Sequence, residues 1–159
     1  VWGFTDDVAH RLHDVRAQTP PGHSGMGTTL SANALALAAM RATLEHVMTP
    51  EAYRHMERLA GLLADGLHAT ITARRLPWHV VRVGARVEFV CAPGPLRNGT
   101  QAESAHAPAL EQAIHLALLN RGCLIAPFHN MMLACPATTE TQVARLQDAF
   151  AAVTDALVA

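Results

Sequence analysis

Lysine is absent from this sequence of 159 residues, because all 12 of its basic residues are arginine. The absence excludes two chemistries within the chain: a lysine Schiff base to a carbonyl cofactor, and the nucleotide-binding P-loop, whose motif requires lysine. An excess of either charge is also lacking, since the formal net charge is -1. Without a basic face, we expect no binding to nucleic acid or to an anionic membrane surface.

Cysteine and long apolar runs are scarce as well. No apolar run approaches the ~20 residues that a membrane-spanning helix needs. The odd number of cysteines, and the wide spacing of Cys91, Cys123 and Cys135, predict reduced core thiols in a cytoplasmic protein. The ten histidines form no HExxH motif and no CxxC is present, so we expect no metal site. A metal-binding domain that uses His115, Cys123, His129 or Cys135 stays open as an alternative.

The residues that are present describe a globular protein with its own core. Half of them are hydrophobic and 16% are charged, which excludes a disordered chain. The length suits one modest domain, or a small domain with a piece of another. Because the sequence starts inside an apolar stretch, Val1 to Phe4, and has no initiator methionine, we expect it to be a fragment of a longer protein.

Apolar spacing and end signals predict five helices. Thr49 and Pro50 mark one start, and a capping box at Thr139 and Gln142 marks another. Gly122 is expected to end a helix in the C′ position. The segment 32–48 is apolar almost all round, so we expect it to be buried between layers or between subunits. The expected helices cover 6–18, 32–48, 49–75, 110–121 and 139–157.

Short apolar or alternating segments between these helices predict strands. Residues 81–91 form either two strands or one strand bent at Gly84, and residues 93–100 form a loop. Residues 1–5 are expected to be the end of a buried strand. Two further short strands are expected at 123–126 and 131–134. The predicted fold class is therefore α+β, with helices on one face of a mostly antiparallel sheet.

A loop rich in glycine and hydroxyl residues, 22–31, precedes the apolar helix. Backbone N–H groups of Gly27, Thr28 and Thr29, together with the two hydroxyls, could hold a phosphate where the chain enters the helix. A glycine turn with serine and threonine caps explains the same residues. Both interpretations stay open on the pattern alone.

Residues 27–39 read Gly-Thr-Thr-Leu-Ser-Ala-Asn-Ala-Leu-Ala-Leu-Ala-Ala. This segment resembles the Gly-Thr-(Leu/Phe)-Ser-Gly-Asn-Pro-Leu-Ala motif of class III pyridoxal-phosphate (PLP) aminotransferases, nearest to the glutamate-1-semialdehyde aminomutase branch. Residues 121–127 are similar to that family's Arg-Gly-x-x-(Leu/Ile)-x-Pro stretch. The resemblance implies a fold-type I PLP-dependent transferase. Residues 1–48 would be the tail of its large cofactor-binding domain, and residues 49–159 its small C-terminal α+β domain.

The resemblance also implies how the cofactor is bound. Thr29 matches the threonine that reaches the phosphate of the PLP in the neighbouring subunit, with Gly27 and Thr28 beside it, so a homodimer with a shared active site is expected. Thr28 replaces the usual glycine, and residues 32–34 replace Gly-Asn-Pro, so the loop departs from the family pattern. The Schiff-base lysine is expected upstream of Val1. The chain itself would then hold no catalytic residue and would be inactive alone.

Substrate residues are expected from the small domain. Arg86 could bind a substrate carboxylate, or it could pair with Glu88 or Glu103. His129 and Asn130 match the turn that faces the active site in the related enzymes. An acidic residue that the aminomutases carry near this turn is absent, which favours amino transfer between an amino acid or amine and a keto acid. The alternative function is a non-catalytic α+β interaction or dimerisation module.

Overall fold

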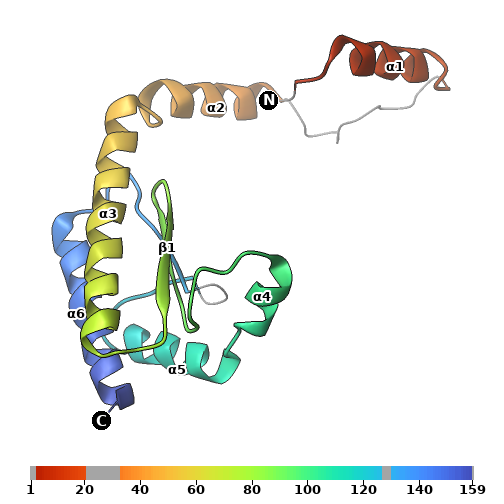
Figure 1. Cartoon of the computed structure of the whole chain (residues 1–159). Coiled ribbons are helices and arrows are strands. Elements are labelled where there is room, and N and C mark those ends of the chain that lie inside the picture. The colour runs from red at the N-terminus through yellow and green to blue at the C-terminus, as the bar shows by residue number, and fades with distance from the viewer. Residues whose placement is uncertain (1–2, 21–32, 127–129, 159) are drawn as a thin grey trace. The chain divides into compact units, whose positions relative to one another are not determined.

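The computed structural model describes residues 3–20, 33–126 and 130–158 (Figure 1). The chain forms two compact units, Val1–Thr43 and Leu44–Ala159. The assignment of residues 1–48 and 49–159 to two domains of a transferase stays a prediction. Within the described ranges, no helix is both long and apolar enough to cross a membrane.

The first unit contains helix α1, Asp6–Ala17, and most of helix α2, Ala34–His46. Thr5 caps α1 by accepting a hydrogen bond from the Val8 N–H. The expected helices at 6–18 and 32–48 are thus confirmed for their described residues. The expected strand at 1–5 is wrong where it can be checked, because residues 3–5 are not in a strand. A strand needs a neighbour to pair with, and the described part of this unit contains none.

Helix α2 exposes its apolar side chains within this chain. Leu35 is 82% exposed and Leu44 is 54% exposed, and α2 has no buried residue. The expected burial of this helix between layers or subunits therefore stays a prediction. Exposed apolar area of this kind favours a covering surface, because burial is worth roughly 25 cal/mol per Å².

The second unit is a three-stranded antiparallel sheet with helices packed against it. The strand order is β1-β2-β3, and α3 contacts β1, β2 and α6. The α+β fold class is confirmed. In chain order the elements are α3 (Pro50–Ala73), β1 (His79–Val83), β2 (Arg86–Val90), α4 (Gly99–Ser104), α5 (Pro108–Leu119), β3 (Met131–Leu133) and α6 (Glu140–Val158).

Two expectations for this unit are corrected. Segment 123–126 is not a strand, because it contributes only the single bridge between Ala126 and Met131. The loop expected at 93–100 gives way at Gly99 to the short helix α4, whose N-cap Asn98 accepts a hydrogen bond from the Gln101 N–H at 2.9 Å. Gly84 has a φ of +55° and joins two separate strands, so the expectation of two strands is confirmed.

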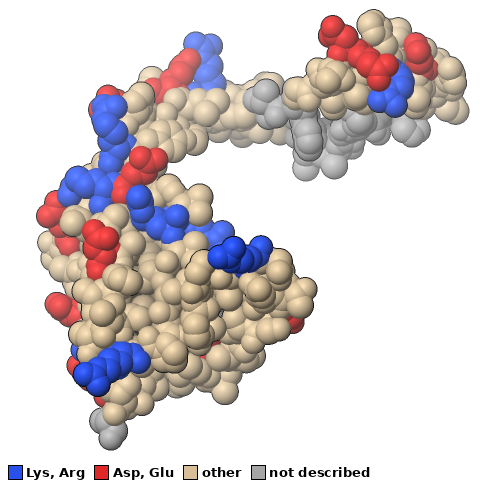
Figure 2. Space-filling view, in the orientation of Figure 1, with Lys and Arg blue, Asp and Glu red and all other residues tan. Residues whose placement is uncertain are grey.

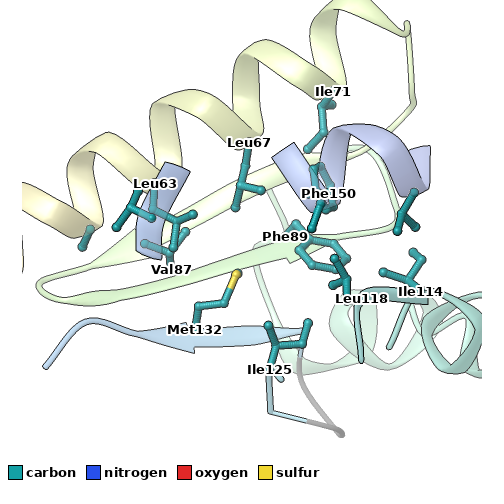
Figure 3. Packing of buried hydrophobic residues seen from close by; sticks show 14 of the residues in the cluster. Leu63, Leu67, Ile71, Val87, Phe89, Ile114, Leu118, Ile125, Met132 and Phe150 are labelled. Atoms are coloured by element: carbon teal, nitrogen blue, oxygen red, sulfur yellow. The ribbon is translucent and has the colours of Figure 1, made fainter. Parts of the chain in front are cut away.

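The core lies between the sheet and the helices (Figure 3). Buried residues of α3 recur every four positions, which places them in one stripe facing the sheet. Phe89 from β2 packs against Phe150 from α6, with ring centroids 4.9 Å apart. Cys91 and Cys123 pack at the edge of this core, as expected for thiols, but Cys135 is exposed in the loop after β3. The stripe on α3 consists of Leu59, Leu63, Leu67 and Ile71.

Helix ends follow the sequence signals. The Thr49 side chain accepts a hydrogen bond from the Ala52 N–H at 3.2 Å. Thr139 and Gln142 form the reciprocal capping box, with hydrogen bonds of 2.9 and 3.3 Å. Gly122 follows α5 with a φ of +74°, the left-handed conformation in which glycine carries no steric penalty. These three end signals are confirmed.

Candidate functional site

One face of the sheet is left open by the helices that form the core. In the antiparallel register Val83 lies opposite Arg86, and Arg86 lies opposite Leu133. Directly opposed residues share a face and successive residues alternate, so these three lie on the face opposite to buried Val87 and Phe89. Val83 is 72% exposed and Leu133 is 64% exposed. We call this surface the open face.

Arg86 lies on the open face, at the start of the central strand β2, and already has a carboxylate partner. Its Nη2 donates a hydrogen bond to Glu88 Oε2 over 2.6 Å. The pairing with Glu88, not with Glu103, is thus the arrangement in this structure. The Arg86 side chain is 47% exposed, and a guanidinium carries five N–H donors, so it can still donate hydrogen bonds to a second carboxylate.

Asn130 lies where the chain enters β3, directly before Met131. It is only 5% exposed and has a φ of +47°, a left-handed conformation that asparagine tolerates better than most residues. Its Oδ1 lies 3.1 Å from His115 Nε2 on α5. Local sequence signals do not identify His115, because it is 15 residues away from Asn130 on another element. His129, the other expected residue of this turn, lies outside the described residues.

A cavity of about 230 Å³ lies beside Asn130 and Glu88 and is also lined by residues of α4 and of the segment that follows it. Glu88 and Asn130 line it from the sheet side, and Glu111 and His106 line it from the helical side. Glu111 Oε2 lies 3.8 Å from His106 Nδ1. Of the two described substrate candidates, Asn130 lines the cavity, whereas Arg86 does not and is linked to it only through its partner Glu88.

The surface of the second unit carries little charge in its middle. In the view of Figure 2, uncharged side chains cover most of this unit, and arginines lie at its margins. Cys91 lies near the cavity residue Glu111. Burial raises the pKa of the Cys91 thiol to about 12, and the negative charge of Glu111 is a second cause of the increase. Cys91 is therefore a neutral packing residue and no nucleophile.

The expected cofactor contacts Gly27, Thr28 and Thr29 lie outside the described residues. What the structure does describe is the helix that follows them. Asn33 Oδ1 accepts a hydrogen bond from the Ala36 N–H at 2.9 Å, so Asn33 caps α2. The N-terminus of a helix attracts phosphate through its free N–H groups and its dipole.

Metal binding finds no support in the described part of the chain. No group of three or more histidine, cysteine, aspartate or glutamate side chains is arranged there to hold an ion. Of the residues in the metal alternative, His115 is hydrogen-bonded to Asn130, and Cys135 is hydrogen-bonded to Thr138. Each of these two side chains thus has a local partner that explains its position.

Known proteins resemble the chain in sequence. No protein-family model matches it. A glutamate-1-semialdehyde 2,1-aminomutase of Anaeromyxobacter dehalogenans strain 2CP-C is 34% identical over 146 residues, which are 91% of this chain and 32% of the relative. The enzyme of the same name from Thermomicrobium roseum is 35% identical over 108 residues, 68% of this chain and 25% of that relative. The chain thus spans about a third or less of these curated relatives.

Solved structures resemble the chain over nearly all of its length. A glutamate-1-semialdehyde aminomutase from Pseudomonas aeruginosa PAO1 is 46% identical with a TM-score of 0.90, covering 98% of this chain and 35% of that one. A variant of an aminomutase from the same strain was solved in complex with PMP. A β-phenylalanine aminotransferase from Variovorax paradoxus is 25% identical with a TM-score of 0.78, covering 97% of this chain and 34% of that one.

Proposed function

From the premise that this chain belongs to the PLP-dependent aminotransferases of the glutamate-1-semialdehyde aminomutase-like branch, we propose that the whole protein transfers an amino group between an amino acid or amine and a keto acid. The observation that carries the proposal is that the structural similarity runs through nearly the entire chain and not through one motif. The chain spans about a third of the length of these relatives.

PLP is the proposed cofactor, and this chain would supply only part of its site. The sequence contains no lysine, so the covalent attachment must come from the rest of the polypeptide. Gly27, Thr28 and Thr29 are proposed to hold the phosphate, next to the N-terminus of α2 that Asn33 caps. When bound, PLP supplies a carbonyl that exchanges the amino group and a ring that withdraws electrons from the substrate carbon.

The proposed assembly is a cytoplasmic, class III homodimer with fold-type I architecture and a shared active site. Residues 1–48 would be the tail of the large domain, and residues 49–159 would be the small domain. The exposed apolar side chains of α2 support an assembly in which this helix is covered, since Leu35 and Met40 are 82% and 50% exposed within the chain. The loop 27–29 would then reach the cofactor of the neighbouring subunit.

The open face is proposed as the substrate side of the small domain. Arg86 would bind the substrate carboxylate in competition with Glu88, which already accepts its hydrogen bond. Asn130 and His129 would line the same side. The energetic consequence is that substrate binding must compensate for a loosened Arg86–Glu88 pair.

A second candidate function is the intramolecular reaction, in which the amino group of glutamate 1-semialdehyde moves from C2 to C1. The names of the relatives favour it, because the curated relatives described above are aminomutases. Against it stands the composition of residues 127–134, which contain no acidic side chain. The two reactions differ in whether a separate amino acceptor is consumed.

The test uses the full-length protein. Purified enzyme is scanned for PLP absorbance and assayed with a panel of amino acids and amines against 2-oxoglutarate and pyruvate, and separately with glutamate 1-semialdehyde. Amino transfer to a keto acid supports the proposal. Turnover of glutamate 1-semialdehyde alone establishes the aminomutase instead. A protein that neither binds PLP nor turns over any substrate is the non-catalytic module.

A further inference from the structure

The contact between His115 and Asn130 links helix α5 to the start of strand β3. Asn130 Oδ1 lies 3.1 Å from His115 Nε2, and the Asn130 residue is only 5% exposed. The Ala126 N–H donates to the Met131 carbonyl at 3.1 Å. Among the described residues, these two hydrogen bonds connect the start of β3 to α5 and to Ala126.

The bond to His115 decides which end of the Asn130 carboxamide is available. With Oδ1 occupied by the His115 N–H, the Nδ2 group remains as a hydrogen-bond donor. The cavity that Asn130 lines also contains the carboxylates of Glu88 and Glu111. Because carboxylates are negative, they favour the orientation in which the N–H end of the carboxamide, and not its oxygen, faces them. Both observations give the same orientation.

We propose that His115 is a positioning residue that fixes Asn130 as a hydrogen-bond donor to the keto or carboxylate oxygen of the substrate. The inference rests on the proposed amino transfer and goes beyond it, because it names the residue that orients the substrate contact. His115 itself lies on α5 and acts only through Asn130.

The orientation predicts an asymmetry between substrates. A keto acid offers keto and carboxylate oxygens as acceptors to Nδ2, whereas an amine donor without a carboxylate offers no oxygen acceptor. Loss of the His115 bond removes the hydrogen bond that holds Oδ1, so that Nδ2 is oriented less firmly toward the cavity. The affinity for the keto acid should therefore fall, while the chemistry after binding continues at nearly the same rate.

The experiment compares full-length wild-type enzyme with three variants under steady-state conditions. His115→Leu removes the donor, and His115→Gln restores an N–H at a similar reach along the side chain. Gln112→Ala changes an exposed position of the same helix and serves as the control. We expect His115→Leu to raise KM for the keto acid about tenfold, with kcat within about twofold of wild type. His115→Gln and Gln112→Ala should retain the wild-type KM.

Unchanged KM in His115→Leu overturns the inference and leaves the proposed amino transfer standing. A fall in kcat that His115→Gln does not rescue also overturns it, because that pattern indicates a structural role alone. A wild-type enzyme without amino transfer overturns the proposed function and this inference together.

A further variant decides the matter if His115→Leu does not fold. Asn130→Asp keeps an oxygen for the His115 N–H and tolerates the left-handed backbone, but it replaces the Nδ2 donor by an acceptor. We expect its KM for the keto acid to rise at least about tenfold. A wild-type KM in Asn130→Asp overturns the inference.

Discussion

Arg86 and Glu88 stand two residues apart on the same face of β2, and the Arg86 Nη2 donates to Glu88 Oε2 over 2.6 Å. Their side chains are 47% and 21% exposed, so the pair lies at the surface of the open face and is accessible from solvent. An arginine that is paired but accessible can exchange one carboxylate for another. A strand residue in this position can therefore bind a substrate without any movement of the backbone.

Replacement of this arginine should weaken the binding of carboxylate substrates. In the full-length enzyme, Arg86→Gln is expected to raise KM for a keto acid by about tenfold or more, because a charge-assisted hydrogen bond is worth roughly 1.5–3 kcal/mol. Amines without a carboxylate should keep their KM. Arg82→Gln, at an exposed position of the neighbouring strand, is the control. Equal effects of the two substitutions on KM would remove Arg86 from the substrate site.

Two glycines of the second unit should respond to alanine in opposite directions. Gly122 has a φ of +74°, and an added Cβ would contact the Arg145 guanidinium, so Gly122→Ala should lower the free energy of unfolding by about 1 kcal/mol. Gly61 lies within α3, and a Cβ there meets nothing within 4 Å. Gly61→Ala should raise the free energy of unfolding by about 0.5–1 kcal/mol. Urea denaturation of the 159-residue chain measures both, and changes of the same sign contradict the assignment.

The ion pair between Arg74, the C-cap residue of α3, and Asp155 of α6 should make the free energy of unfolding depend on pH in the acid range. Arg74 donates to both oxygens of Asp155, at 2.7 and 2.8 Å, and these hydrogen bonds lower the pKa of the Asp155 carboxyl below its usual 3.8. The unfolded state then binds the proton more readily. The contribution is fully present above the ordinary pKa and is lost as pH falls through the lowered value.

In the measurement, the urea midpoint of wild type and Asp155→Asn is followed as the pH is lowered through about 4. The wild-type midpoint should fall more steeply than that of Asp155→Asn. Asp148→Asn, which removes an exposed carboxylate of the same helix, is the matched control. Parallel curves for wild type and Asp155→Asn would show that the pair contributes nothing to stability.

The cysteines should differ strongly in reactivity. Burial and the charge of Glu111 raise the pKa of Cys91 to about 12. The Thr138 hydroxyl, which donates to Cys135 Sγ at 3.4 Å, and nearby backbone N–H groups lower the pKa of the exposed Cys135. At pH 8, iodoacetamide should modify Cys135 at least about a hundredfold faster than Cys91, since the thiolate is the reactive form. Peptide mapping by mass spectrometry of wild type and Cys135→Ser checks this, and comparable labelling of Cys91 contradicts it.

Signals that act within one turn of chain were sufficient to predict much of the second unit. The caps at Thr49 and Thr139 and the glycine at 122 involve hydrogen bonds or dihedral angles that three or four neighbouring residues determine. The same holds for the alternation that places Val87 and Phe89 inside the core. The family motif at 27–39 and its aminotransferase-like fold were also visible in the sequence.

Features that depend on distant partners were not predictable in this way. Segment 123–126 has the apolar composition of a buried strand, yet Leu124 is 81% exposed, because only Ala126 finds a bridging partner in β3. The bond between His115 and Asn130 joins two elements that no periodic pattern relates. Cys135 has apolar neighbours in the sequence but lies in an exposed loop. Pairing and packing across elements decide such positions, and local composition does not.

The most direct test of the account is the affinity of the full-length protein for PLP, measured by absorbance titration of wild type, Thr29→Ala and Thr43→Ala. Thr43 is the control, because its hydroxyl donates to the Ala39 carbonyl within α2 and has no predicted cofactor contact. We predict that wild type and Thr43→Ala bind PLP alike, and that Thr29→Ala weakens binding by about 1–3 kcal/mol, or roughly 5- to 150-fold. An unchanged dissociation constant in Thr29→Ala would contradict the assignment of this chain to the phosphate site, and no binding by wild type would contradict the PLP-dependent function.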